Sequence, residues 1–312
     1  MPTDKQVYIT DPDVEKFLEY FGSLVSGENK FQHSYKVDAP KWKGWIKRQE
    51  PLPSFYRKIE SSEATIRPAY KWCIDDIRGA FDGYFWPVKS GCDADVFKCN
   101  KIVLDDLSKE IKEHLENDDE YKLFAACVKI LEWGDVYKGS VSWLLNALEE
   151  KALIYRIKMA AKYLDGVSLE DMQQFGSRGD LRMDSGLTKI YSLASSSSVI
   201  YDGRVGAALC LLIRKSLEMG EVRKVPDLLQ FKWGGSQAKK KNGKDKRDPS
   251  TVGYKFKKLT NNSYEHALLN LRTNWLLEAA LPEDNLWGFE RKIDKLRALE
   301  AALFMIGSSV NG

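Results

Sequence analysis

Hydrophobic residues along most of this chain recur every three or four positions, the spacing that places them on one face of an α-helix. The first such stretch covers residues 11–26, where Asp11 can cap the helix and Pro12 suits its first turn. Ser140 and Ser168 are the expected caps of two later helices. In all, the pattern predicts further helices at residues 63–82, 104–115, 121–131, 140–163, 168–175, 184–194, 203–218, 262–280 and 286–307.

Two stretches near the N-terminus lack this period. Residues 28–62 mix aromatic residues, lysines and prolines, which is typical of irregular chain with short strands, and residues 83–100 resemble a loop. The sequence therefore predicts a mostly α protein with a small irregular or α+β N-terminal part. We divide it into a mixed segment (1–100), a helical core (101–232), and a basic loop with C-terminal helices that pack on that core (233–312).

Composition narrows the class of protein. The 312 residues are 43% hydrophobic, enough for a sizeable core, and 30% charged. No run of eighteen apolar residues could span a membrane, and the start of the chain has no secretory signal. The five cysteines are widely spread and odd in number, which favours reduced thiols in a cytoplasmic protein. They and three isolated histidines have no metal-ligand spacing, so we expect no metal or other cofactor.

Basic residues gather in one segment although the net charge is only +3. Between Lys239 and Lys258 the chain carries nine basic residues against two acidic ones. Such a cluster is either a solvated loop or a loop that contacts phosphate groups, and the sequence leaves both interpretations open.

Two helix starts carry candidate chemistry. A short apolar run ends at Asp202, and a helix of small and apolar residues begins directly after it. Asp202 is either an N-cap or a fixed carboxylate that stabilises positive charge on a sugar carbon and activates water. Upstream, the glycine-containing turn at residues 183–189 is either an ordinary capped helix start or a place where N–H groups around Gly186 bind an anion, with Lys189 adding a charged contact.

The order of these segments resembles the helix-hairpin-helix DNA glycosylases, which have a glycine-rich hairpin, then an aspartate, then a helix that opens with a basic residue and valine. Ser185-Gly186-Leu187-Thr188-Lys189 matches the second half of the hairpin, and Asp202-Gly203-Arg204-Val205 matches the aspartate segment. The resemblance covers about residues 121–220. The first hairpin glycine is missing, and the hairpin lies closer to the aspartate than in the family. The resemblance implies a helix-hairpin-helix-like bundle.

The resemblance also implies a function, which is hydrolysis of the N-glycosidic bond of a modified or damaged base flipped out of double-stranded DNA. Asp202 would be catalytic, and the base pocket would contain Trp133, Tyr137 and Tyr201. The residues expected to contact DNA are Gly186, Thr188, Lys189, Arg204, Lys239, Lys240 and Lys241. We expect a monomer that binds no membrane. Similar bacterial proteins are suspected of acting on phage DNA, so repair and phage defence are both open.

Other interpretations stay open. Lys189 is one place away from the lysine nucleophile of bifunctional family members, which favours a monofunctional hydrolase, but a Schiff base at Lys189 or Lys138 stays open. The chain is alternatively a non-catalytic helical nucleic-acid-binding protein, in which Asp202 only caps. A third hypothesis is a scaffold that binds protein partners through the apolar face of its last helix, at Leu296, Leu299, Leu303 and Ile306.

Overall fold

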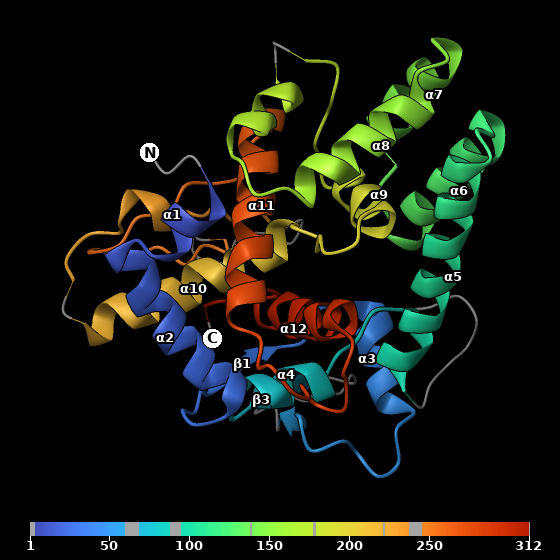
Figure 1. Cartoon of the computed structure of the whole chain (residues 1–312). Helices are drawn as coiled ribbons and strands as arrows, with labels where there is room; N and C mark the ends of the chain where they lie inside the picture. The colour runs from blue at the N-terminus through green and yellow to red at the C-terminus, as the bar shows by residue number, and fades with distance from the viewer. Residues whose placement is uncertain are drawn as a thin grey trace.

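The chain folds into a mostly helical structure with one small antiparallel sheet, as the pattern predicted. The computed structural model describes residues 4–59, 69–87, 95–137, 139–176, 179–220, 222–236 and 245–311. Figure 1 shows that α11 and α12 lie at the centre, with α1, α2 and α10 on one side and α5 to α9 on the other.

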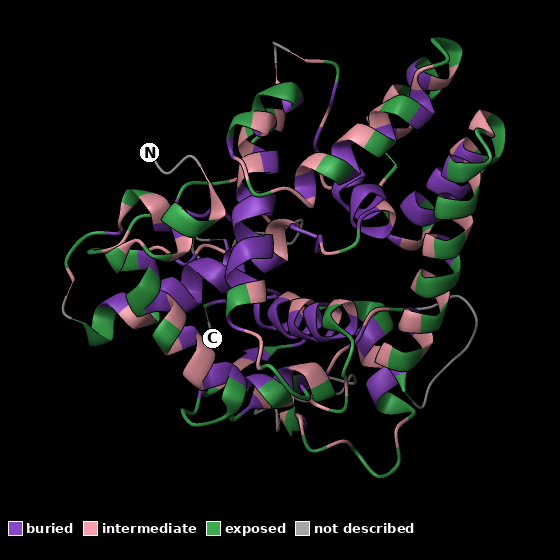
Figure 2. Ribbon diagram, in the orientation of Figure 1, coloured by how far each residue is buried: buried purple, intermediate pink, exposed green. Residues whose placement is uncertain are grey.

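Three long helices form the centre of the core. They are α10 (Gly203–Met219), α11 (Ser263–Ala279) and α12 (Lys292–Ile306). Each is buried on most of its surface, which Figure 2 shows as mostly purple, because the other helices pack around them. Leu296, Leu299, Leu303 and Ile306 are fully buried within this core. The face that the scaffold hypothesis offers to a partner is therefore already covered.

The N-terminal part adds two helices and the sheet. Helices α1 (Lys5–Ile9) and α2 (Pro12–Ser26) come first, and Asp11 caps α2 as predicted by accepting the Asp13 and Val14 N–H groups. The remaining elements are β1 (His33–Lys36), α3 (Pro40–Lys47), β2 (Tyr56–Ile59), β3 (Ala69–Ile74) and α4 (Ile77–Asp82). Strand β3 pairs antiparallel with both β1 and β2, and α4 packs on α12.

The prediction of one helix over residues 63–82 was wrong where the structure describes this stretch. Residues 69–74 form a strand, and only 77–82 are helical. Tyr70, Trp72 and Ile74 are buried alternately with more exposed neighbours, which is the period of a half-buried strand. Trp72 stacks on Tyr35 of β1, with ring centroids 4.8 Å apart. Cross-strand aromatic contacts of this kind outweighed the local helical spacing.

The middle of the chain forms two antiparallel helix pairs and a short helix between them. These are α5 (Val96–Glu116), α6 (Glu120–Trp133), α7 (Ser140–Glu149), α8 (Leu153–Leu164) and α9 (Leu187–Ala194). Residues 140–163 were predicted as one helix, but the chain turns between α7 and α8, where Lys151 adopts a φ of 54°. The N-cap of α7 is Gly139, because the Ser140 hydroxyl instead donates to Asp184. Short 3₁₀ segments are Glu170–Phe175 and Asp227–Leu229.

The buried side chains of all three predicted segments join one hydrophobic core that runs from Tyr8 to Val310. No helix in the described ranges is long and apolar enough to cross a membrane. Cys73, Cys127 and Cys210 are free thiols, as expected, whereas Cys99 is disulfide-bonded. The sequence did not predict that bond.

Candidate active site

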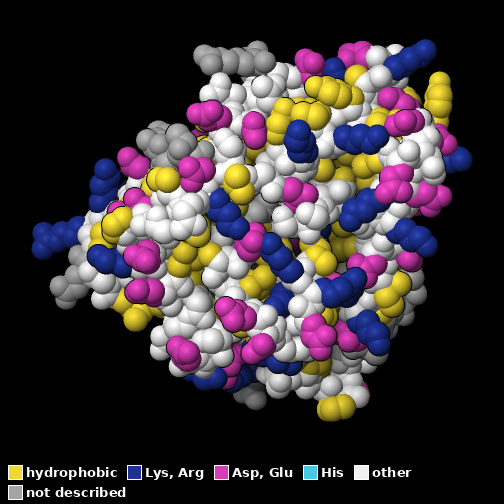
Figure 3. Space-filling view, viewed as in Figure 1, with side chains coloured by type: hydrophobic (Ala, Val, Ile, Leu, Met, Phe, Trp, Pro, Cys, Tyr) yellow, Lys and Arg dark blue, Asp and Glu magenta, His cyan; other side chains and the backbone are white. Residues whose placement is uncertain are grey.

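A cavity of about 900 Å³ lies where α5, α6, α9, α10 and α12 approach one another. Asp202, Lys189, Arg204 and Trp133 all contribute to its wall, so the structure brings four of the predicted site residues together. On the face shown in Figure 3, basic and acidic side chains are interspersed with hydrophobic ones.

Asp202 caps α10, and one of its carboxylate oxygens stays available. Its Oδ1 accepts the N–H groups of Arg204 at 2.8 Å and Val205 at 3.0 Å. Its Oδ2 makes no hydrogen bond with any described residue, and Asp202 lines the cavity. The predicted cap is confirmed, and it fixes the carboxylate with one oxygen left for a ligand or water.

The surroundings of Asp202 keep it ionised at neutral pH. Burial raises the pKa of this carboxyl, but the charges of Lys189 and Arg204 and the Val205 N–H more than compensate. The pKa of Asp202 therefore lies below its ordinary value. A carboxylate held ionised inside a cavity can stabilise a developing cation and accept a proton from water.

Lys189 is held against the same wall. It lies on α9 with only 6% of its surface exposed, and its Nζ donates to the Ser185 carbonyl oxygen at 2.7 Å. Burial lowers the pKa of its ammonium group, which the charges of Asp202 and Glu300 only partly oppose. The side-chain stem of Lys189 passes over Gly134, where a Cβ would lie 2.5 Å from its Cδ. A glycine at 134 is thus what leaves room for this lysine.

Two tryptophans form a rigid aromatic wall. The Trp86 indole N–H donates to the Trp133 carbonyl oxygen at 3.0 Å, and the Trp133 indole N–H donates to Asn100 Oδ1 at 2.9 Å. The Asn100 amide in turn donates to the Trp86 carbonyl oxygen at 3.0 Å. Because both indole N–H groups are engaged in the protein, the rings are oriented in advance to stack with a planar ligand.

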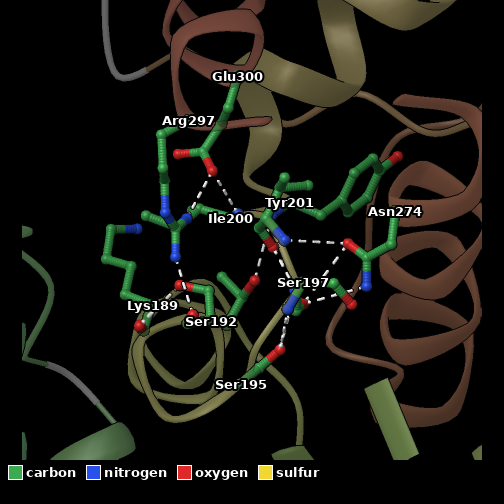
Figure 4. Close-up of polar contacts among 12 residues, drawn as sticks. Lys189, Ser192, Ser195, Ser197, Ile200, Tyr201, Asn274, Arg297 and Glu300 are labelled. Atoms are coloured by element: carbon green, nitrogen blue, oxygen red, sulfur yellow. Dashed lines mark hydrogen bonds and ion pairs between the residues drawn. The ribbon is translucent and has the colours of Figure 1, made fainter. Parts of the chain in front are cut away.

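The link between α9 and α10, residues 195–202, is fixed by side chains from the central helices (Figure 4). Glu300 accepts the Ile200 N–H at 2.8 Å and pairs with Arg297 at 2.7 Å. Arg297 also donates to the Ser192 carbonyl oxygen at 2.8 Å, so this ion pair joins α12 to α9 and to the link. Asn274 of α11 accepts the Val199 N–H at 3.0 Å. These contacts set the position at which Asp202 enters the cavity.

Three comparisons with known proteins give no relative. No family model, no curated protein and no solved structure matches this chain.

The hairpin residues predicted to bind phosphate are engaged within the protein. Asp184 Oδ1 accepts the N–H groups of Gly186 and Leu187, each at 2.9 Å, so these amides do not face a ligand. Thr188 is fully buried and donates its hydroxyl proton to Asn270. Its hydroxyl oxygen accepts the Tyr201 N–H at 3.1 Å, which ties α9 to the link. Both positions are structural, which corrects their assignment as DNA contacts.

Of the three aromatic residues predicted for the base pocket, only Trp133 lines the cavity. The Tyr201 ring is fully buried against Phe231 and His266, and its hydroxyl donates to the Lys232 carbonyl oxygen at 2.7 Å. Tyr137 is 45% exposed and lies outside the cavity lining. Both assignments to the pocket are therefore corrected. Lys138, Lys239, Lys240 and Lys241 lie outside the described residues.

The cavity also contains residues that the sequence analysis did not select: Trp86, Asn100, Arg247, Arg297 and Glu300. They lie 45 to 116 positions from Asp202 and belong to no motif. Of these five residues, only Arg247 could have been selected from the sequence, since it belongs to the basic segment. Within the described ranges, no three His, Cys, Asp or Glu side chains are grouped so that they could hold a metal ion.

The serine-rich part of the link depends on one carboxylate. Asp165 accepts the N–H groups of Ser196 at 2.8 Å and Ser197 at 2.9 Å, and the hydroxyls of Ser195 and Ser197. Burial raises the pKa of Asp165, but these hydrogen bonds more than compensate and hold it below its ordinary value. Ser195 and Ser196 line the cavity, so Asp165 supports the site from outside.

This arrangement predicts an acid-dependent loss of stability. A carboxyl whose pKa is lowered by folding stabilises the protein above the unfolded pKa, about 3.9 for Asp, and loses that effect as pH falls through the folded value. Asp165→Asn should therefore lower the unfolding midpoint at pH 7, and the difference from wild type should shrink below about pH 4. Urea unfolding between pH 3 and pH 7 measures it. A difference that stays constant over this range would contradict the role of the charge.

Proposed function

We propose that this protein hydrolyses the N-glycosidic bond of a modified or damaged base in double-stranded DNA. One observation carries the proposal: Asp202, ionised and fixed at the start of α10, lies in the wall of a large cavity together with two tryptophans. A flipped nucleotide needs a pocket with an aromatic surface for the base and a carboxylate beside the sugar. The resemblance of the Asp202 segment to the DNA glycosylases supports the same assignment.

The chemistry follows from the position of the carboxylate. As the bond between sugar C1′ and the base nitrogen breaks, its electron pair leaves with the base and positive charge develops on the sugar. Asp202 stabilises that charge and its free Oδ2 accepts a proton from the attacking water, whose oxygen bonds to C1′. The departing base takes up a proton, so the products are the free base and an abasic site.

The aromatic wall suits both a purine and a pyrimidine base. Trp86 and Trp133 have centroids 6.1 Å apart and are inclined at 55°, so they form two faces of one corner rather than a parallel slot. A planar ring can stack on one tryptophan and meet the other edge to face.

We assign α9, the link and α10 to the second half of a helix-hairpin-helix unit. Since the Gly186 N–H already donates to Asp184, side chains rather than hairpin N–H groups make the DNA contacts of this unit.

The test is base release by the wild-type chain. Duplex DNA carrying oxidised, alkylated or deaminated bases, and phage DNA with hypermodified bases, is incubated with the protein, and abasic sites are detected by alkaline strand cleavage. We expect release from at least one substrate class and no enzyme–DNA adduct on borohydride reduction. An adduct would instead show an amine nucleophile, for which Lys189 in the cavity wall is a candidate. Salt-sensitive DNA binding without any base release would favour the non-catalytic nucleic-acid-binding alternative.

A further inference from the structure

The cavity wall beside Asp202 holds two arginines whose charges act on that carboxylate, but whose guanidinium groups make no direct ion pair within the described part of the chain. Several basic side chains of the wall are paired: Arg297 with Glu300, Lys101 with Asp294, and Lys246 with Asp38. In contrast, no described residue forms an ion pair with, or accepts a hydrogen bond from, the guanidinium group of Arg204 or Arg247. Unpaired arginines inside a cavity are costly unless a ligand provides the missing acceptor.

Arg204 is oriented by aromatic rings. Its guanidinium carbon lies 4.3 Å from the centroid of Phe304 and 5.5 Å from that of Trp86. Contacts of this type use the flat faces of the guanidinium group, so its N–H donors, which lie in the plane, stay free. Arg204 is therefore fixed in place by its aromatic neighbours while its hydrogen bonds are unused.

Arg247 lies on the neighbouring part of the wall. Its backbone N–H donates to Asp245 Oδ1 at 3.0 Å, which sets the turn from which the side chain enters the cavity. Its Nε is buried and has no hydrogen-bond partner in the described part of the chain. Burial and the charge of Arg204 lower the pKa of Arg247 to about 10. Two guanidinium groups close enough to repel each other favour binding of an anion near both.

We propose that Arg204 and Arg247 form a phosphate-binding subsite inside the cavity. The phosphate belongs to the nucleotide whose base lies against Trp86 and Trp133, and in this respect the inference rests on the proposed function. Asp202 does not prevent anion binding, because the charges of Lys189, Arg204 and Arg247 all act on this carboxylate. A DNA phosphodiester and the monoester of a free nucleotide offer the same chemistry, and the experiment separates them.

The experiment compares ligands by isothermal titration calorimetry on the full chain. The probes are inorganic phosphate, 2′-deoxycytidine, its 5′-monophosphate, and a duplex with a tetrahydrofuran abasic analogue. For a diester source, the duplex should bind at least about 10-fold more weakly to Arg204→Gln and to Arg247→Gln than to wild type, a loss typical of one charge-assisted contact. For a monoester source, the monophosphate should bind wild type about 10-fold more tightly than the nucleoside does, and both variants should abolish this preference.

Arg78→Gln is the matched control. Arg78 lies on α4, is paired with Asp82, and is outside the cavity, so this variant removes one positive charge without touching the subsite. A loss of binding equal to that of the Arg247 variant would show that only net charge matters and would overturn the proposal. So would Arg204 and Arg247 variants that bind every probe as wild type does.

Thermal unfolding gives a second measurement. Arg247→Gln should fold at least as stably as wild type without phosphate, because the change removes a buried unpaired donor and a like-charge repulsion. Phosphate should raise the midpoint of wild type and not that of the variant. Phosphate binding that depends on both arginines, together with no base release from any DNA, would support the subsite and reject the glycosylase assignment.

Discussion

Asp202→Asn should reduce the rate of base release by about 10²- to 10⁴-fold, the range for loss of a general base, while the protein stays folded. Asparagine caps helices about as well as aspartate, so its side-chain oxygen can still accept the Arg204 and Val205 N–H groups. The variant loses only the negative charge and the proton-accepting oxygen in the cavity. Single-turnover release from the best DNA substrate, with a thermal unfolding curve, measures both effects.

Asp119→Asn makes the same chemical change at a different helix start. Asp119 caps α6 by accepting the Lys122 N–H at 3.0 Å, and it does not line the cavity. Its substitution should leave the rate of base release unchanged. DNA binding by Asp202→Asn should also persist, because the change removes a negative charge from a wall that carries several basic groups. If Asp202→Asn released base at the wild-type rate, Asp202 would be a cap and nothing more.

The sequence was sufficient to locate Asp202 and the helix that it caps. The Asp-Gly-Arg-Val segment follows an apolar run and precedes small and apolar residues, and each of these features is local. The same is true of α2, whose cap at Asp11 and proline in the first turn are adjacent in the chain. Signals of this kind depend on neighbouring residues, so one sequence is enough to find them.

The rest of the site depends on contacts between distant residues. Trp86 becomes a pocket wall only because its indole N–H donates to Trp133, and Asn100 holds both. Gly186 resembles a phosphate-binding amide until Asp184 is seen to accept its hydrogen bond. Tyr201 was chosen because it precedes Asp202, yet adjacent residues of an extended segment point to opposite sides, and its ring lies in the core. Tertiary packing determines which of these side chains line the cavity, and the pattern of residues along the sequence does not reveal that packing.

Gly206→Ala should destabilise the protein by about 3 kcal/mol or more, the upper range for overpacking a core. Gly206 lies in the first turns of α10, and an added Cβ would lie 2.0 Å from the Lys232 carbonyl oxygen and 2.9 Å from the Tyr201 hydroxyl. Backbone cannot withdraw as a flexible side chain can. The backbone segment at Lys232 must therefore shift, and the Tyr201–Lys232 hydrogen bond must break. Since this turn begins at Asp202, base release should fall as well.

Gly22→Ala is the matched control, because it makes the same substitution inside helix α2. Nothing lies within 4 Å of the position that a Cβ at Gly22 would occupy. Alanine favours a helix interior over glycine by about 1 kcal/mol, so this variant should be slightly more stable than wild type. Urea unfolding of both variants should therefore give free-energy changes of opposite sign. Two changes of the same sign would mean that helix propensity, rather than the close approach of Lys232 to α10, determines the effect at Gly206.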